Sequence, residues 1–389
     1  MPYFNYSVHP VHAAAASFWQ RRAFLNAWWS LYQDDSRWTP PDYQRTRREL
    51  DPRHNEHLAR LEATLIHIDA LHRTGLRRSR TDQQEIPLTS ILERTLAAAA
   101  SIIDGRRKGK TGHLALAHFG SDKEAFDTLY YHLVETLSAA GFHRLVGPVG
   151  LSPHLGSGLQ VDGWDEWPPA HTPANPPYVP ELVEARLTPL QDGRLYRAAV
   201  PARPPEPLPD PARIASFDPA RLAGDLRPLL VAAVDNPTAG FPPPDAAETA
   251  FLLRSLGTGR VTGFLAEMDG EPAGFVLVGP DRAGWLRATR GGRSLWRQAR
   301  YGVEARLWPG RRLAGGQILF GAVLPGWRRQ GIGAQLWQQA TGHASRMGWA
   351  SLAVGPVWLP KGSDSAAVAF LEARSATARQ SYRLYERSF

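Results

Sequence analysis

The sequence repeats three short signatures in the same order, and this repetition limits the fold more than any other feature. The first half contains GHLALAHF (112–119), GFHRLVGPV (141–149) and LVEAR (182–186). The second half contains GQILFGAV (316–323), GWASLAVGPV (348–357) and FLEAR (370–374). The tripeptide RLY follows the third signature in both halves, beginning at Arg194 and at Arg383. This shared order indicates a tandem duplication, so two similar structural units are expected.

Both copies alternate strand-like and helix-like segments, which predicts an α/β fold with a mixed αβα arrangement. In the second copy the apolar spacing predicts helices at 221–234, 249–256 and 332–347, and strands at 213–218, 318–324 and 352–357. A hairpin is predicted at 261–279 around Asp269-Gly270. In the first copy, 18–32 is predicted helical, and 63–71 and 95–103 are predicted strands.

A proline-rich stretch, PARPPEPLPDPAR (201–213), separates the two copies and is typical of an extended linker. The predicted domains are therefore 1–205 and 206–389. Each is expected to be a twisted mixed sheet with helices on both faces.

The composition excludes several kinds of site. The 389 residues include no cysteine, so disulfides, thiolate metal sites and cysteine nucleophiles are excluded. There is no run of about 18 apolar residues, and the N-terminus lacks the pattern of a signal peptide. We therefore expect a cytoplasmic protein that does not enter a membrane. The net charge of +8 favours anionic partners in general, whether nucleic acid, acidic metabolites or phosphorylated cofactors.

The segment WRRQGIGAQLW (327–337) stands between a strand-like run and an amphipathic helical run. A helix N-terminus has free N–H groups and a partial positive charge. No Ser, Thr, Asp or Asn lies between 326 and 335 to cap this helix, and two arginines and two glycines precede or begin it. This combination predicts a phosphate-binding loop. The alternative is a flexible turn, because glycine is itself acceptable at an N-cap.

The first copy has the opposite chemistry at the equivalent position. Ser121-Asp122-Lys123-Glu124 predicts a capping box, in which a hydroxyl and a glutamate satisfy the free amides. Its two acids occupy the place where an anion would bind. This end of the first copy is therefore predicted to be closed to phosphate.

Residues 323–336 resemble the coenzyme A motif of the GCN5-related N-acetyltransferases (GNAT), roughly V-x-P-x-x-R-x-x-G-x-G-x-x-L. The resemblance extends over about 206–389, and the first copy resembles the same fold without the motif, as in a tandem GNAT protein with a degenerate first half. It implies acetyl-CoA as acyl donor, with the pyrophosphate on the loop amides. The pantetheine arm would pair with backbone near Val323, where parallel strands 318–324 and 351–357 splay apart and Gly355-Pro356 lies at the opening. The cofactor-binding residues it implies are Val323, Arg328, Arg329, Gln330, Gly331, Ile332, Gly333 and Ala334.

The catalytic residues are less well defined. The family often places a general-acid tyrosine on its late helix, in a pattern like aromatic-Tyr-x-x-x-Gly, where this chain has Leu371 and, at the glycine, Ser375. We considered as substitutes Tyr382 and Tyr385, Ser363 and Asp364, and Glu267 as a base. For the two tyrosines ordinary packing is the favoured alternative, because RLY recurs in the first copy.

Two further features carry weaker predictions. The segment 282–312 mixes arginines with aromatic residues, which is compatible with nucleic-acid binding or with the mouth of an anionic cofactor site. An amphipathic helix with its aromatic residues packed inward is favoured over both. Histidines stand in pairs at His9 and His12 and at His113 and His118, but no carboxylate or third ligand accompanies them in the sequence, so no metal is expected.

Together these patterns predict an acetyl-CoA-dependent N-acyltransferase that moves an acetyl group to a primary amine. The partner would be an amine-bearing small molecule or peptide, and the protein a monomer or homodimer. The alternative is a non-catalytic acyl-CoA-binding or regulatory protein that keeps the cofactor site without a general acid. The sequence does not identify the acceptor.

Overall fold

The computed structural model describes residues 5–73, 76–78, 85–87, 91–106, 110–204, 212–257, 261–307, 315–360 and 365–389. The first half contains β1 (Asn5–His12), α1 (Phe18–Tyr32), α2 (Tyr43–Glu49), α3 (Glu56–Ala59), β2 (Glu62–Arg73), β3 (Leu76–Arg78), β4 (Glu85–Pro87), β5 (Ile91–Ile103), β6 (Thr111–Phe119), α4 (Lys123–Ala139), β7 (Arg144–Val149), β8 (Leu159–Asp162), α5 (Val179–Glu184) and β9 (Thr188–Ala199). The second half contains β10 (Arg213–Phe217), η1 (Pro219–Ala223), α6 (Arg227–Val234), α7 (Ala246–Leu256), β11 (Thr262–Met268), β12 (Glu271–Pro280), α8 (Ala283–Ala288), α9 (Leu295–Leu307), β13 (Gly315–Val323), η4 (Pro325–Trp327), α10 (Ile332–Arg346), β14 (Ser351–Trp358), α11 (Ala366–Glu372) and β15 (Thr377–Ser388).

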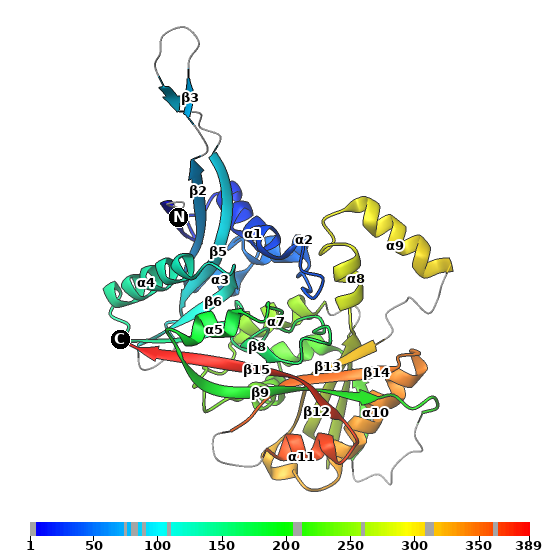
Figure 1. Cartoon of the computed structure of the whole chain (residues 1–389). Coiled ribbons are helices and arrows are strands. Elements are labelled where there is room, and N and C mark those ends of the chain that lie inside the picture. Colours follow the sequence, from blue (N-terminus) through cyan, green and yellow to red (C-terminus); the bar gives the residue numbers. More distant parts are fainter. Residues whose placement is uncertain are drawn as a thin grey trace.

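Strands from both halves form one 13-stranded sheet, in the order β1-β2-β5-β6-β7-β15-β9-β14-β13-β12-β11-β10, with β8 beside β15 (Figure 1). The short strands β3 and β4 pair only with each other. Among the described strands only β6·β7 and β13·β14 pair in parallel. The mixed α/β class is confirmed, but the two separate sheets expected from the duplication are one. The predicted boundary between 205 and 206 lies outside the described residues and stays a prediction.

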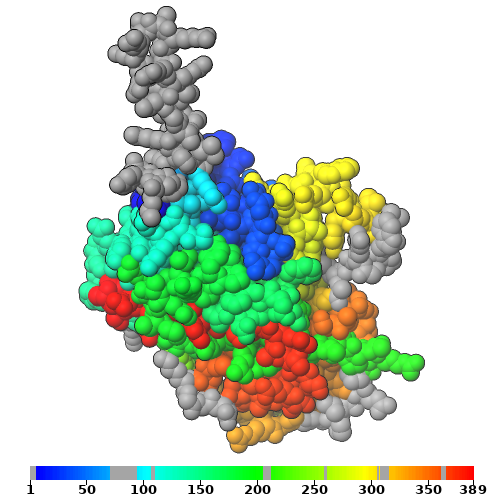
Figure 2. Space-filling model, viewed as in Figure 1, coloured from blue at the N-terminus to red at the C-terminus, as the bar shows by residue number. Residues whose placement is uncertain are grey.

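The two halves share a sheet because each gives its last strand to the other. Strand β9 of the first half pairs with β14 of the second, and β15 of the second pairs with β7 of the first. At the centre, β9 and β15 pair antiparallel with each other. Figure 2 shows the C-terminal residues, in red, emerging between green and cyan residues of the first half. Neither half completes its sheet without the other.

The exchange gives a structural meaning to the repeated signatures. Glu184, from the first copy's LVEAR, accepts a hydrogen bond from the Tyr385 hydroxyl at 3.0 Å and pairs with Arg383 at 3.0 Å. Both partners belong to the second copy's RLY. In the other direction, Tyr196 of the first copy's RLY packs against Leu371 of the second copy's FLEAR. The LVEAR or FLEAR signature of each copy therefore contacts the RLY tripeptide of the other copy.

Helices cover both faces of the sheet, as predicted. On one face α1, α6 and α7 contribute to a single core that runs through both halves. On the other face α4 and α5 pack on the first half, while α10 and α11 pack on the second. Among the described residues, no helix is both long enough and apolar enough to span a membrane.

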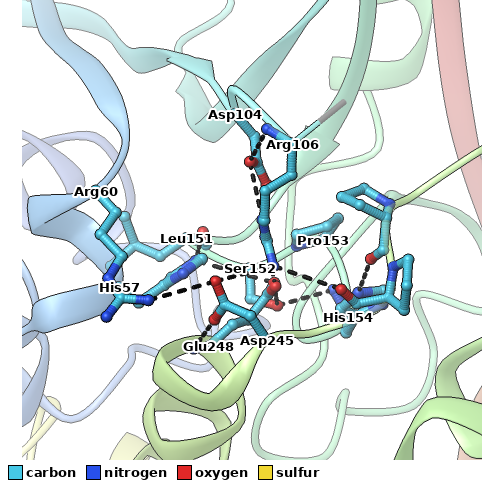
Figure 3. Close-up of polar contacts among 12 residues, drawn as sticks. His57, Arg60, Asp104, Arg106, Leu151, Ser152, Pro153, His154, Asp245 and Glu248 are labelled. Atoms are coloured by element: carbon cyan, nitrogen blue, oxygen red, sulfur yellow. Dashed lines mark hydrogen bonds and ion pairs between the residues drawn. The ribbon is translucent and has the colours of Figure 1, made fainter. Parts of the chain in front are cut away.

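A buried polar cluster joins the halves within the shared core (Figure 3). Glu248 of α7 is fully buried, accepts a hydrogen bond from the Ser152 hydroxyl at 2.7 Å and pairs with Arg106 at 2.7 Å. Arg106 also pairs with Asp104 at 2.5 Å. His57 lies 3.9 Å from Glu248 and stacks on Phe251 of α7. Glu248 is the acceptor shared by groups from the first half, so the cluster ties α7 to that half.

Most predicted elements are present near their expected bounds, including the helix at 18–32 and the hairpin around Asp269-Gly270. The predicted helix at 221–234 is instead divided into η1 and α6. A proline stands in the first turn of both pieces, and Gly224 ends the first. Proline is favoured at a helix start but breaks a helix interior, which explains the division.

The arginine-rich insertion has two parts. The segment around α8 binds the first half: Arg282 pairs with Asp42 at 3.6 Å, and Arg287 lies 4.1 Å over the Trp167 ring. Helix α9 projects from the molecule in Figure 1, and Trp296 is 76% exposed. The prediction that the aromatic residues pack inward is therefore wrong for Trp296. Residues 308–312 of the insertion lie outside the described residues.

Candidate functional site

Strands β13 and β14 form a fork in the sheet of the second half. They pair in parallel only from Gly315 to Ile318, opposite Ser351 to Val354. Beyond Ile318, β13 continues to Val323 paired with β12 alone, so its other edge has no described strand beside it. The pairing of β14 with β9 is interrupted between Val354 and Val357, where Gly355 has φ +117°. The two strands stop pairing after Ile318 and Val354, inside the segments where the family resemblance implies that they splay apart, and Gly355-Pro356 follows the last paired residue.

The fork leads directly to the N-terminus of α10. Gly331 is the N-cap residue, in a left-handed conformation with φ 82°. Among the described residues no side chain caps this helix, so the amides that precede Ala334 are available to an anion. The Ala334 amide already donates to the Gly331 carbonyl at 2.9 Å. Residues 328–331 are exposed, and Arg328 and Arg329 bring two positive charges. The side chain of Arg328 folds back, and its Nε donates to the Val323 carbonyl at 3.1 Å.

The remaining predicted cofactor residues lie around the same helix end. Gln330 is exposed, and its side-chain amide is 3.4 Å from the Gly326 carbonyl. Ile332 is buried and anchors the helix in the core, while Gly333 and Ala334 are half-buried in its first turn. The backbone amides of residues 331–334 therefore share one helix terminus, next to the end of β13.

Helix α4 of the first half begins with an acidic cap. Its N-cap is Asp122, whose carboxylate accepts from the Ala125 amide at 2.9 Å. The predicted capping box from Ser121 to Glu124 is wrong in detail, because the helix starts one residue later. Acidic side chains still close the N-terminus of α4 to anions, because Asp122 and Glu124 lie there and both accept from the Tyr6 hydroxyl.

An aromatic residue and a third arginine, not assigned to this site from the sequence, adjoin the loop. A side-chain atom at Gly333 would lie 3.3 Å from the Phe370 ring and 3.8 Å from Val323. Arg374 lies 3.6 Å over the Phe370 ring and donates to the Phe370 carbonyl at 3.0 Å. Glycine at position 333 therefore keeps a narrow space open between α10, α11 and the end of β13. Phe370 and Arg374 both belong to the FLEAR repeat, but that repeat predicts neither the approach of Phe370 to Gly333 nor the contact of Arg374 with the Phe370 ring.

Both candidate tyrosines on β15 are fully buried. The Tyr382 hydroxyl donates to the Gln380 side chain at 3.2 Å, and burial raises its pKa above the usual range. Tyr385 lies in the first half's core with α4 and α5, and burial together with Glu184 raises its pKa. The exchange of β15 thus places Tyr385 in the core of the first half.

The other candidates are more dispersed. Glu267 is half-buried near the end of β11 and pairs in register with Pro272. The next residue, Ala273, accepts a hydrogen bond from the Leu324 amide. Glu267 therefore lies at the same end of the sheet as the loop, but three strands away from β14, with β12 and β13 between them. Ser363 and Asp364 lie outside the described residues.

Tyr196 of β9 is a residue that the sequence reasoning missed. It is fully buried and pairs in register with Val354, the last residue of β14 that still pairs with β13. Its ring lies in one apolar cluster with Leu371, the residue that the family resemblance places at the tyrosine position. Its hydroxyl has no hydrogen-bond partner among the described residues. An unpaired buried hydroxyl is costly, so this one stands out from the other buried tyrosines of the site.

Comparison with known proteins agrees with this geometry. The sequence model of the acetyltransferase (GNAT) family matches residues 231–356. A tandem GNAT protein from the clavulanic acid biosynthesis pathway is 12% identical, with a TM-score of 0.56 and 98% of each chain covered. A probable N-acyltransferase of unknown function from Enterococcus faecalis is 8% identical, with a TM-score of 0.52, over 99% of this chain and 73% of that one.

A third structure is the glucosamine N-acetyltransferase region of a fungal multi-domain β-N-acetylglucosaminidase. It is 11% identical with a TM-score of 0.53, over 99% of this chain and 38% of that chain. No curated protein matches by sequence. At these identities the structures establish the fold alone, and the family model covers residues 231–356. These residues thus match the acetyltransferase (GNAT) family, and the chain as a whole has the fold of a tandem GNAT protein.

Proposed function

We propose that the protein is an acetyl-CoA-dependent N-acyltransferase whose second half holds the donor. The observation that carries this proposal is the fork between β13 and β14, which ends at the uncapped N-terminus of α10. An unpaired strand edge suits an extended amide-containing arm, and a helix N-terminus suits a phosphate. Both lie on one continuous surface formed by adjacent residues of the chain.

The residues of the site fit this donor. The amides of residues 331–333 would take the pyrophosphate, with Arg328 and Arg329 supplying positive charge. The predicted contact from Ala334 would not use its amide, which donates to the Gly331 carbonyl. The free edge of β13 near Val323 would pair with the pantetheine arm. Phe370 would bound the narrow space beside Gly333. The first half, closed by Asp122, would bind no donor and would complete the sheet of the second half instead.

The thioester supplies an activated acetyl group, so the protein needs mainly to position it and to manage two protons. The amine nitrogen forms a bond to the carbonyl carbon, the carbon–sulfur bond breaks, one proton leaves the nitrogen, and one reaches the departing thiolate. We propose Tyr196, at the fork and without a hydrogen-bond partner, as the donor of the second proton. Glu267 is our proposed acceptor of the first. Tyr196 would then be a residue of the first half serving the site of the second.

The alternative is a protein that binds acyl-CoA without turning it over. The observation in its favour is Leu371, which stands where the related enzymes often carry their general acid. Both functions predict binding of the donor, and they differ in release of free coenzyme A. The acceptor we propose is a primary amine on a small molecule or peptide.

The absence of cysteine makes release of free thiol a direct assay. A thiol-reactive chromogenic reagent will report only coenzyme A, because the chain contributes no thiol. We expect thiol release from acetyl-CoA with at least one member of a panel of amines, peptides and aminoglycosides, and loss of release in Gly331→Asp. Donor binding with no release across the panel would favour the non-catalytic alternative. No binding and no release would contradict both.

A further inference from the structure

We propose that His9, His67 and Asp69 form a binding site for a divalent transition-metal ion, with Zn²⁺ the best match to its donors. The site lies at the edge of the first half, on strands that take no part in the proposed acetyl transfer. It revises the sequence-based prediction that the chain holds no metal.

The register of β1 and β2 brings these three residues together. His9 lies directly opposite His67 in the antiparallel pair. Asp69 follows His67 by two residues on β2, and side chains two apart on a strand point to the same face. The sequence reasoning could not find the site, because His9 and Asp69 are 60 positions apart and only the pairing of the strands joins them.

The distances suit a tetrahedral ion. The Nε2 atoms of His9 and His67 each lie 3.5 Å from Oδ2 of Asp69. Two metal–ligand bonds of about 2.0–2.1 Å at a tetrahedral angle place their donor atoms roughly 3.3–3.4 Å apart. The ligand atoms of all three residues lie within 4.8 Å of one another. The two imidazole rings now stack with their centroids 4.6 Å apart, so the exposed His9 ring would have to rotate to direct its Nε2 at the same ion as His67.

The charge of the cluster also favours a cation. Asp69 has a side chain only 10% exposed, and among the described residues its ion-pair partners are these two histidines alone. At 3.5 Å both contacts are longer than the 2.7–2.9 Å of a charge-assisted hydrogen bond. A buried carboxylate needs compensation by a partner, and a divalent ion between the three donors would supply it.

The exposure of the three ligands differs in a way that leaves an entry path. The His9 side chain is 44% exposed, against 15% for His67. Two imidazoles and one carboxylate suit Zn²⁺ and, as probes, Co²⁺ or Ni²⁺. With three protein ligands, the fourth position would be open to water. An ion bound here would fasten the edge strand β1 to β2, so its effect is expected on stability.

Co²⁺ titration of the full-length protein without a histidine tag tests the site. We expect one equivalent of Co²⁺ to bind with the visible absorption bands of a tetrahedral complex, and Zn²⁺ to displace it and raise the unfolding temperature. His9→Ala should lose the bands and the thermal shift. His12→Ala is the matched control, because His12 lies on the same strand but faces Thr64, with its Nδ1 3.4 Å from that hydroxyl; it should retain both.

Two results would overturn the proposal. One is the absence of tetrahedral bands in the wild type, and the other is equal Co²⁺ affinity in the wild type and in His9→Ala. His9 is exposed, so its replacement is not expected to impair folding. Asp69→Asn keeps the shape of the buried ligand while removing its charge, and it should also lose the bands.

Discussion

At the scale of single residues, the two copies differ in whether the N-cap residue of one helix leaves its amides free for an anion. Gly331 leaves the amides of α10 open, whereas Asp122 fills the same position on α4. This contrast could be predicted from the sequence, because capping depends on short-range residue types. The position of the cap was one residue wrong in the first copy, since helix ends depend on backbone geometry that neighbouring residues do not determine.

The proposed role of Tyr196 predicts an unusual variant. Tyr196→Phe should lower the rate of acetyl transfer without raising the KM for acetyl-CoA. Its stability should stay the same or increase, because the hydroxyl removed has no hydrogen-bond partner among the described residues. Tyr382→Phe is the control, since it removes an equally buried hydroxyl that bonds to Gln380. Steady-state kinetics and urea unfolding of both variants measure this; equal activity in Tyr196→Phe and wild type would contradict the role.

A half-buried histidine with a buried ring nitrogen predicts loss of stability in acid. Burial lowers the pKa of His118 from 6.5 to about 3, and its Nδ1 is buried without a partner among the described residues, against the Trp28 ring. Between these values the unfolded chain binds a proton that the folded chain does not. Stability is therefore complete above about pH 6.5 and falls as the pH drops toward 3.

From pH 7 to pH 5 this histidine should cost the wild type about 2 kcal/mol of unfolding free energy. His118→Phe keeps a ring against Trp28 and removes the titration. Urea unfolding at the two pH values should show a smaller loss in the variant. An equal loss in both proteins would show that His118 does not contribute.

At the scale of elements, most helices and strands were predictable but the partners of the last strands were not. Apolar spacing and the Asp-Gly turn identify an element from its own residues. The partner of β15, in contrast, depends on contacts such as Tyr385 with Glu184, about 200 positions away. The RLY repeat favoured packing for Tyr385, which is fully buried, but it did not reveal that each copy packs on the other. The His9 cluster was missed for the same reason.

The strand exchange predicts that a substitution in one half loosens the other. Tyr385→Ala should cost about 3–5 kcal/mol, as for other large buried rings. Amide hydrogen exchange should then accelerate in α5 and β7 of the first half. The reciprocal variant Tyr196→Ala should accelerate exchange in α11 of the second half. Acceleration of α11 in Tyr385→Ala, with α5 and β7 unchanged, would contradict the observed pairing.

At the scale of the whole molecule, the shared sheet and the shared core make the two halves interdependent. The duplication predicted two units of one fold, and that much of the architecture is confirmed. Their joining was not predictable, because it depends on the exchanged strands and on a polar cluster whose members come from both halves. Patterns in a single sequence predict which residues form each helix or strand, but they do not predict which helices and strands pack together.

This interdependence predicts unequal effects for two arginines of the cluster in Figure 3. Arg106→Leu leaves the fully buried Glu248 carboxylate without its cation and should cost about 3–5 kcal/mol. Arg60→Leu removes a side chain that is 53% exposed, 3.6 Å from Asp245, and should cost less than about 1 kcal/mol. Urea unfolding measures both. Similar losses in the two variants would show that the cluster does not depend on the buried pair.

The most direct test of the account is calorimetric titration of acetyl-CoA into the wild type, Gly331→Asp and Gly331→Asn. Both variants place a side chain on a left-handed residue, but only aspartate adds charge where the pyrophosphate should bind. Repulsion of about 4 kcal/mol at 4 Å near a protein surface would lower the affinity by roughly a hundredfold or more. We predict one equivalent bound by the wild type, weaker binding by the asparagine variant and none detectable for the aspartate variant. No binding by the wild type, or equal binding by the two variants, would contradict the proposed donor site.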